Sequence, residues 1–343
     1  MNLNYIKMSP LTGMVGYGGG GTGLTLTNSA IPKWYGERGI PQGYFRHNTT
    51  HYEIEYITIQ TPGNGTDFGD LYADITNQTG FGGQGMGIFA CGQLRNGSYV
   101  VTNSTQYITI ATLGSGADFC DMIATGTGRM SCSDGNRGIV TGGSSDPDSI
   151  EYTEIATKSN GANFGNLLHD RVNCAATNDD TYAAVWGGTA ESALSNIDRM
   201  TIQTPSNATD FGDMTHWTNN SGENNPTYRN NQGGVCSDQG RGLAGGGYRG
   251  TGGNDYNSDF IDYIVHATPA NATSFGNLTV GRTLLARGNC SSSTRGVFSA
   301  GDDGSGGLKT LDYITFASAS NATSFGSLSS QDNCEGIAAC SGD

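Results

Sequence analysis

The chain has 343 residues, of which 55 are glycine, 14% are charged and 35% are apolar. Its apolar residues form short Ile, Val, Tyr and Phe clusters along the whole length, which predicts many short strands with little or no helix. The formal net charge is -14 with only four lysines, which excludes a nucleic-acid partner because phosphate binding requires a clustered basic surface. No apolar run is long enough for membrane insertion.

The N-terminal segment Met1–Lys7 has no charged stretch followed by an apolar stretch, so no signal peptide is expected. We therefore expect the protein to be made and assembled in a cytoplasm. Residues 1–13 precede the first predicted strand and are expected to form a small anchoring segment. That first strand is predicted at Met14–Gly20, which ends in Gly-Gly as several later strands do.

A phrase that starts as Tyr56-Ile-Thr-Ile and ends at Phe68-Gly recurs along the chain. The interval from its first residue to the Phe is 12 residues in every copy, and successive Phe residues are 51, 45, 47, 64 and 50 residues apart. A period near 50 with a fixed internal spacing marks a repeat array. The repeated aromatic residues are Tyr56, Phe68, Tyr107, Phe119, Tyr152, Phe164, Phe211, Tyr263, Phe275, Tyr313 and Phe325, and Arg199 takes the Tyr position of the fourth copy.

Each copy contains four strand-like pieces, which we name strands A to D. Strand A is rich in small residues, strand B runs into Gly-Gly or a near equivalent, strand C is the Tyr-Ile-Thr-Ile piece, and strand D carries Phe-Gly. Strand C is apolar on both alternating faces: Ile54 and Tyr56 lie on one face, and Ile57 and Ile59 on the other. Such a strand must be covered on both sides, and the stacked blades of a β-propeller provide that cover.

Strands B, C and D each occur six times if Met14–Gly20 is the first strand B, but strand A occurs only five times before the C-terminal tail. The tail, Asp332–Cys340, supplies the sixth. We therefore predict an all-β fold in which residues 14–343 form a single six-bladed β-propeller, with the C-terminal strand pairing with Met14–Gly20 to complete the first blade.

Four of the eight cysteines occupy one equivalent position in strand A, the innermost strand of such a blade. They are Cys132, Cys236, Cys290 and Cys340. Because these residues belong to different blades around the axis, they are predicted to be buried free thiols and to form neither disulfides nor a metal site.

The order of a small-residue strand, a Gly-Gly strand, a Tyr strand and an aromatic strand resembles the kelch repeat, with Phe68 and its equivalents where kelch repeats carry a Trp. The wording Asp-Tyr-Ile-Thr-Ile followed by Asn-Ala-Thr-Asp-Phe-Gly-Asp also resembles repeat proteins of marine bacteriophages, which are regarded as virion or tail-appendage components. The resemblance covers nearly the whole chain. It implies a kelch-like propeller that acts as a structural or host-recognition protein of a virion, such as a tail fibre, with other virion proteins as partners.

Three connections are longer than their equivalents, at about residues 21–52, 215–229 and 247–260. All three are B–C or D–A connections, which lie on one face of a propeller, and long loops on a rigid scaffold are common binding sites. Their aromatic and basic side chains are predicted to bind a host-surface glycan or another protein, or else to pack the loops onto the propeller. These residues are Trp34, Tyr35, Arg38, Tyr44, Phe45, Arg46, His47, His216, Trp217, Tyr228, Arg229, Tyr248, Arg249 and Tyr256.

No catalytic residue, cofactor or metal site is predicted, because the five histidines are scattered and no spacing singles out a pair of carboxylates. The acidic stretches Asp146–Asp148 and Asp302–Asp303 lack the ligand pattern of a calcium loop. Asn207, Asn271 and Asn321 are interpreted as turn residues and not as glycosylation sites. Two other functions stay open: a cytoplasmic kelch-type adaptor, and a carbohydrate-active enzyme with its site at the mouth of the axis.

Overall fold

Short strands and tight turns make up nearly all of the described chain. The computed structural model describes residues 33–42, 53–95, 99–190, 194–215, 233–251, 254–329, 334 and 336–343, which belong to one unit spanning residues 32–343. Their one helical element is the 3-10 turn η1 (Ile155–Thr157), so no helix in these ranges is long and apolar enough to cross a membrane. The predicted anchoring segment, residues 1–13, lies outside the described residues.

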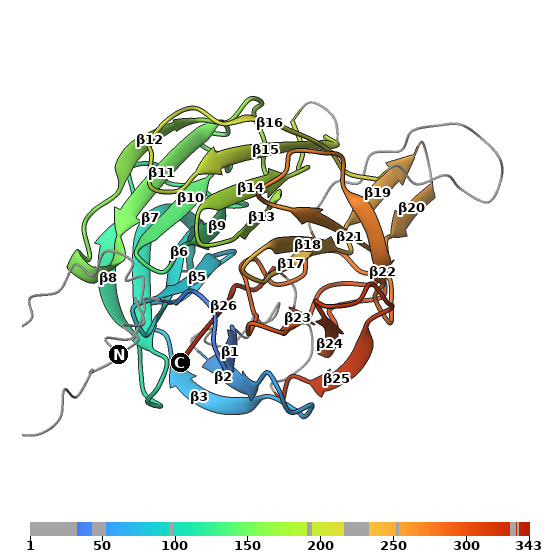
Figure 1. Cartoon of the computed structure of the whole chain (residues 1–343). Helices are drawn as coiled ribbons and strands as arrows, with labels where there is room; N and C mark the ends of the chain where they lie inside the picture. The colour runs from blue at the N-terminus through green and yellow to red at the C-terminus, as the bar shows by residue number, and fades with distance from the viewer. Residues whose placement is uncertain are drawn as a thin grey trace, which may run out of the picture. The chain divides into compact units, whose positions relative to one another are not determined.

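Six small antiparallel sheets form a ring, so the predicted six-bladed β-propeller is confirmed (Figure 1). From the axis outward, blade 1 consists of β26 (Ala339–Gly342), β1 (Arg38–Pro41), β2 (Glu53–Thr58) and β3 (Thr66–Asp70). Blade 2 consists of β5 (Thr79–Gly83), β6 (Met86–Arg95), β7 (Tyr99–Thr109) and β8 (Ala117–Asp121), and β4 (Ile75–Thr76) also pairs with β6. Blade 3 consists of β9 (Met130–Ser133), β10 (Arg137–Thr141), β11 (Ser149–Glu154) and β12 (Ala162–Asn166).

The second half of the chain repeats this order. Blade 4 consists of β13 (Ala175–Asn178), β14 (Tyr182–Trp186), β15 (Asn196–Thr201) and β16 (Thr209–Asp213). Blade 5 consists of β17 (Gly234–Ser237), β18 (Arg241–Gly245), β21 (Phe260–Val265) and β22 (Thr273–Asn277), with the hairpin β19 (Tyr248–Thr251) and β20 (Asn254–Asn257) inserted between strands B and C. Blade 6 consists of β23 (Arg295–Ser299), β24 (Thr310–Thr315) and β25 (Thr323–Ser327), and a bridge between Ser291 and Gly296 joins the strand A segment to β23.

The C-terminal strand closes the ring, but its partner differs from the predicted one. β26 pairs antiparallel with β1, with Ile40 opposite Cys340, so strand B of blade 1 is Arg38–Pro41 and the expected pairing with Met14–Gly20 is wrong. The Arg-Gly pair followed by apolar residues that begins β1 also begins β10, β18 and β23, and this pair marks strand B better than the Gly-Gly ending does. Met14–Gly20 lies outside the described residues.

The fixed 12-residue interval places one aromatic ring against another in every blade except blade 4, which has Arg199 at the Tyr position. The strand C tyrosine and the strand D phenylalanine meet edge to face, with ring centroids 6.4 Å apart for Tyr56 and Phe68 and 5.8 Å apart for Tyr107 and Phe119. The Tyr–Phe pairs of blades 3, 5 and 6 have the same geometry. In this geometry the positively polarised edge of one ring points at the negatively polarised face of the other, which is a favourable electrostatic contact.

In blades 1, 3, 5 and 6 an arginine at the start of strand B covers the other side of the strand C tyrosine. The Arg137 guanidinium lies 4.2 Å from the centre of the Tyr152 ring, and Arg295 lies equally close to Tyr313. In blade 4 the two residue types exchange places, and Arg199 on strand C lies 3.6 Å from the ring of Tyr182 on strand B. The exchange explains why the fourth repeat has Arg at the Tyr position, since the cation–π contact is retained.

The outer strands run around the circumference (Figure 1), and a backbone hydrogen bond joins each one to the C–D turn of the next blade. The asparagine of the repeated C–D turn accepts a hydrogen bond from the last residue of the preceding strand D, as Asn207 Oδ1 does from the Asn166 amide at 3.0 Å. Asn64, Asn271 and Asn321 make the same contact. The turn also lies so close that a Cβ on Gly165 would be 2.3 Å from the Ser206 carbonyl oxygen.

The inner strands are joined by short, buried polar side chains. Hydrogen bonds link Thr79 to Ser131, Asn178 to Ser133 and Ser237, Ser237 to Asn289, and Ser291 to Ser341. All of these residues are buried, and their hydrogen bonds join blade to blade around the axis, while Asn178 Oδ1 and Asn289 Nδ2 are buried without a hydrogen-bond partner. Cys132, Cys236, Cys290 and Cys340 are buried and free beside them, as predicted.

Removing β26 tests the closure. Deleting residues 339–343 leaves the inner edge of β1 unpaired and removes Ser341 from the axial network, so we expect the unfolding free energy to fall by about 4 kcal/mol or more. Denaturant unfolding measures the change. Asp343→Asn keeps the side-chain oxygen that accepts from the Glu37 amide and should cost less than about 0.5 kcal/mol. A truncated chain with wild-type stability would contradict the observed closure.

Two glycine substitutions test the contact between an outer strand and the C–D turn of the next blade. Gly165→Ala combines a strained φ of 153° with a clash against the Ser206 carbonyl, and we expect a loss of about 3 kcal/mol in unfolding free energy. The nearest atom to a Cβ on Gly63 is 3.9 Å away, so Gly63→Ala should change the unfolding free energy by less than about 0.5 kcal/mol. Equal effects of the two substitutions would show that the C–D contact between blades is unimportant.

Candidate functional site

The structure describes only part of the predicted binding set. Trp34, Tyr35, Arg38 and Tyr248 are described, and the backbones of Arg249 and Tyr256 face each other across the β19–β20 hairpin. The other predicted residues lie outside the described ranges: Tyr44, Phe45, Arg46, His47, His216, Trp217, Tyr228 and Arg229. The first four of these fall between β1 and β2, which is the true first B–C connection.

Trp34, Tyr35 and Arg38 do not belong to the B–C connection in which the sequence placed them. Because strand B is β1, Trp34 and Tyr35 precede it and lie at the opposite end of blade 1, on the face formed by the A–B and C–D turns. Arg38 begins β1 and stacks 4.8 Å from the Tyr56 ring centre, while its Nη1 donates to the Ile110 carbonyl of blade 2 at 2.6 Å. Arg38 therefore joins two blades.

Trp34 closes the axis on this face. Its side chain is only 2% exposed, and its indole N–H donates to Asp180 Oδ1 at 3.0 Å. Asp180 lies in the A–B turn of blade 4, which is opposite blade 1 in a ring of six. Gln239 of blade 5 donates to the other Asp180 oxygen at 3.1 Å, so three blades meet over the axis.

Arg287 closes the axis at the other face. It precedes the strand A segment of blade 6 and donates to Asn77 Oδ1 at 3.4 Å and to Asn173 Oδ1 at 3.2 Å, in the connections that enter blades 2 and 4. Burial lowers the pKa of its guanidinium to about 10. Both asparagines have left-handed backbones, with φ of 56° and 53°. In the described residues, both mouths of the axis are thus covered by side chains that cross it.

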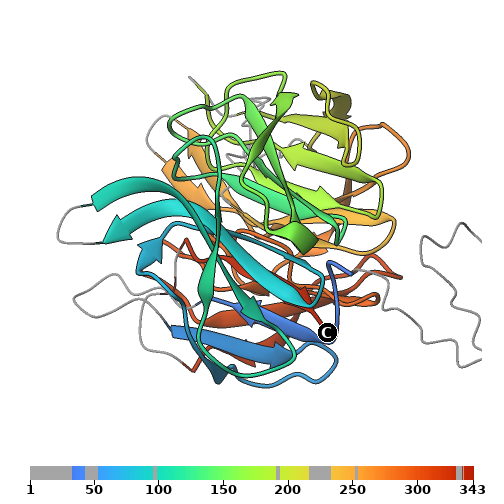
Figure 2. The same cartoon turned by 90° about the vertical axis from the view of Figure 1, so that its left-hand side faces the viewer.

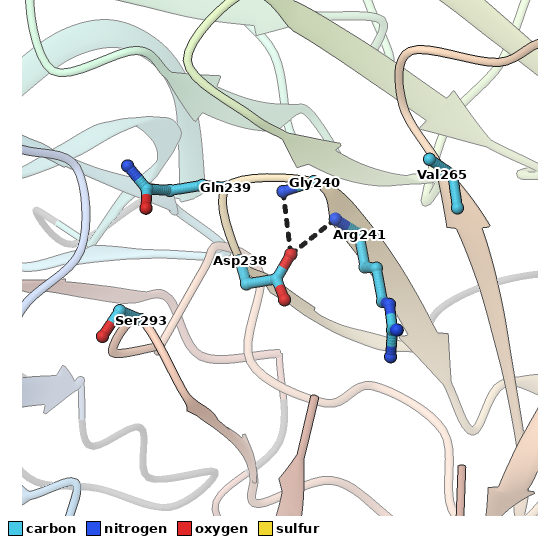
Figure 3. Close-up of a pocket in the computed structure, with 6 residues that line it drawn as sticks. All are labelled: Asp238, Gln239, Gly240, Arg241, Val265 and Ser293. Carbon is cyan, nitrogen blue, oxygen red and sulfur yellow. Dashed lines mark hydrogen bonds between the residues drawn. The ribbon is translucent and has the colours of Figure 1, made fainter. Parts of the chain in front are cut away.

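A surface depression of about 440 Å³ lies on the A–B/C–D face between blades 5 and 6 (Figure 3). It is lined by Asp238, Gln239, Gly240, Arg241, Val265 and Ser293. Asp238 Oδ1 accepts hydrogen bonds from the amides of Gly240 and Arg241, at 2.8 and 2.5 Å, and thereby fixes the turn. The depression presents a carboxylate, a guanidinium, an amide and a hydroxyl group, which can bind a neutral polar group through several hydrogen bonds.

Sequence reasoning missed the buried charged groups. The residue before each strand C tyrosine is acidic or Gln, and three of these acids pair with buried arginines: Glu151 with Arg129 at 2.7 Å, Asp198 with Arg171 at 2.8 Å, and Asp312 with Arg282 at 3.0 Å. The acids also accept hydrogen bonds from D–A connections, as Asp198 does from the Leu168 amide. The recurring acidic residue before the strand C tyrosine is visible in the sequence. Because these side chains are buried, the pattern indicates packing between blades and not a binding site.

The other chemically active side chains offer no reactive cluster. In the described ranges no three His, Cys, Asp or Glu residues lie close enough to hold a metal ion. Burial raises the pKa of Cys91, Cys132 and Cys290, among others, which favours the unreactive thiol form. Asp302 and Asp303 accept hydrogen bonds from Gly304 and Ser305 within their own turn.

The sequence was compared with models of known protein families and with curated proteins, and nothing matches in either comparison.

His266 is a buried ionisable residue at a position that is apolar in the other repeats. It follows β21, where the equivalents are Ile59, Ile110, Ile155, Ile202 and Phe316, and it is fully buried. Its Nε2 lies 3.0 Å from Thr177 Oγ1, which also accepts from the Trp186 indole at 2.8 Å. Burial lowers the pKa of His266 from 6.5 to about 4, so the ring is neutral at pH 7.

His266 makes the stability of the protein sensitive to acid. Between pH 6.5 and about 4 the unfolded chain binds a proton that the folded chain excludes, so the unfolding free energy falls as the pH is lowered. His266→Ile should remove about 2 kcal/mol of this loss between pH 7 and pH 4.5, measured by denaturant unfolding at both pH values. Ile202→Val changes the equivalent position of blade 4 without removing an ionisable group, so it should leave the pH dependence unchanged. A wild-type pH profile in His266→Ile would contradict the assignment.

Proposed function

We propose that this protein is a non-enzymatic structural component of a bacteriophage virion, a tail fibre or similar appendage. It binds a host-surface glycan or another virion protein through the face formed by its B–C and D–A connections. The repeat wording supports the virion role by resemblance. The choice of face is supported by the extra strand length, the inserted hairpin and the exposed apolar residues that some of the described blades have on that face.

The additions to the blades lie on the B–C side. β6 and β7 have 10 and 11 residues, whereas β1 has 4 and β2 has 6, so blade 2 extends as an arm (Figure 2, teal strands). The β19–β20 hairpin is a second addition between strands B and C. On the opposite face the described A–B turns are short, and side chains such as Asp134 and Asp179 bind their backbone amides.

Exposed apolar side chains at the start of the D–A connections carry the proposal. Tyr72, Ile123 and Leu168 occupy equivalent positions in blades 1, 2 and 3, with exposures of 61%, 58% and 45%. In blades 4, 5 and 6 the same position holds Thr215, Thr279 and Ser329, and the two threonine hydroxyls donate to Asp262 and Asp312. One half of this face therefore presents large apolar groups, which commonly anchor macromolecular interfaces.

Two equally exposed residues of blade 2 test which face binds. Ile123 and Leu113 are both 58% exposed, but Ile123 begins a D–A connection and Leu113 lies in the C–D connection. We expect Ile123→Ser to weaken binding to host cells, or to the adjoining virion protein, about tenfold, while Leu113→Ser leaves it unchanged. Adsorption of labelled protein measures the affinity. Equal effects of the two substitutions, or no effect of Ile123→Ser, would exclude this face as the binding surface.

The virion role is tested separately by locating the chain in the particle. A reconstruction of the phage that encodes it should show a six-bladed ring in an appendage, with the B–C/D–A face turned outward or against a neighbouring protein. Purified particles that lack the chain would contradict the proposal.

A further inference from the structure

The grooves between blades on the A–B/C–D face are filled by glutamine side chains in two places. The glutamine stands four residues after the first residue of the repeated phrase and reaches back to the A–B turn of the preceding blade. Gln203 of blade 4 donates to Asp134 Oδ2 of blade 3. Gln60 of blade 1 donates to Ser292 Oγ at 2.8 Å and Thr294 Oγ1 at 2.9 Å in blade 6. A carboxamide is thus the group that two of these grooves already hold.

The groove between blades 5 and 6 lacks this side chain, as do three others, in which the position holds Ala111, Ala156 or Ala267. The equivalent residue is Ala317, which follows Phe316, and the Phe316 carbonyl accepts a hydrogen bond from Arg241. The turn of blade 5 otherwise matches that of blade 3, since Asp238 and Asp134 each accept two backbone amides through Oδ1. Asp134 Oδ2 then accepts from Gln203, whereas Asp238 Oδ2 has no partner in the described residues. The 440 Å³ depression is lined by Asp238, the equivalent of the residue that accepts from Gln203 in blade 3.

The lining of the depression selects for a neutral group that donates and accepts. Figure 3 shows the Asp238 carboxylate between Ser293 and Arg241. A carboxylate on the ligand would be repelled by Asp238, and an ammonium group by Arg241. A carboxamide avoids both, because its N–H groups donate to Asp238 Oδ2 and its oxygen accepts from the Arg241 guanidinium or the Ser293 hydroxyl. No aromatic ring lines the depression to stack on a sugar, which favours a protein ligand over a glycan.

We propose that the depression between blades 5 and 6 is a docking site for a partner protein that inserts an Asn or Gln side chain, in place of the glutamine that fills two of the other five grooves. The site lies on the face opposite to the proposed B–C/D–A binding surface. It does not depend on that surface, and the protein can hold a different partner on each face.

The test uses a peptide as the probe. The full chain, labelled with ¹⁵N, is titrated with acetyl-Gly-Gln-Gly-amide and, as controls, with the same peptide carrying Glu or Leu in place of Gln. We expect the amide signals of Gly240, Arg241 and Ser293 to shift with the Gln peptide, and at least tenfold smaller shifts at the same concentration with the two control peptides.

Ala317→Gln fills the groove from within. We expect it to reduce the response to the Gln peptide at least tenfold, with a melting temperature equal to or above that of the wild type. Ala267→Gln places the same side chain at the equivalent exposed position of blade 5 and should leave the response unchanged. Asp238→Asn keeps an acceptor for the turn but turns an amide group toward the groove, so it should also abolish the response.

Three outcomes would overturn the proposal. One is a response to the Leu peptide as large as that to the Gln peptide. Another is an unchanged response in Ala317→Gln. The third is a titration in which N-acetylglucosamine, and not the Gln peptide, shifts these signals in a manner blocked by Ala317→Gln, which would assign the site to a glycan. None of these results bears on the test of Ile123 and Leu113, so the two surfaces are judged independently.

Discussion

The ring depends on the contact by which an arginine at the start of strand B joins blades 1, 3, 5 and 6 each to the next blade. The guanidinium stacks on the tyrosine of its own strand C and donates to a carbonyl at the end of strand C in the next blade, as Arg38 does to Ile110 and Arg137 to Ile202. A stacked, partly desolvated cation of this kind contributes about 1 to 2 kcal/mol. Because strand C is apolar on both faces, the blades must stack. The arginines fix how they stack, and the exchange of Tyr182 and Arg199 in blade 4 shows that the stacked pair is what the fold retains.

Closing the axis moves any binding chemistry to the two faces. Trp34 crosses the axis at one mouth and Arg287 at the other, and the inner strands between them are joined by buried Ser, Thr and Asn side chains. Burying a guanidinium beside two amide oxygens and no carboxylate costs free energy of folding. The pKa of Arg287 nevertheless lies near 10, so the group is charged at pH 7. Because Arg287 links the connections of three blades, we infer that it holds the centre of the ring rigid.

Much of the fold was predictable because it is repeated. The period, the 12-residue interval and the missing strand A led to six blades and to closure by the C-terminus. The position of the first strand B is not predictable from the Gly-Gly ending alone, because Met14–Gly20 carries that ending while β1 is Arg38–Pro41, which carries the Arg-Gly beginning. Because Trp34 precedes β1, it lies on the A–B/C–D face and not in the predicted B–C connection. The contact of Trp34 with Asp180, 146 residues away, joins opposite blades, and no local pattern reports such a contact.

The candidate sites were less predictable, since they consist of departures from the repeat whose meaning depends on the neighbouring blade. The sequence around Ala317 gives no sign of a site. Its meaning comes from the comparison with Gln203, which fills the matching groove and binds Asp134. Ile123 is likewise an ordinary apolar residue until Thr279 is seen to bind Asp312 from the same position. Both kinds of departure occur at exposed positions, where substitution costs little stability. The buried positions are held to one plan by the blade contacts, so the exposed ones are where six copies of a single unit are free to acquire different partners.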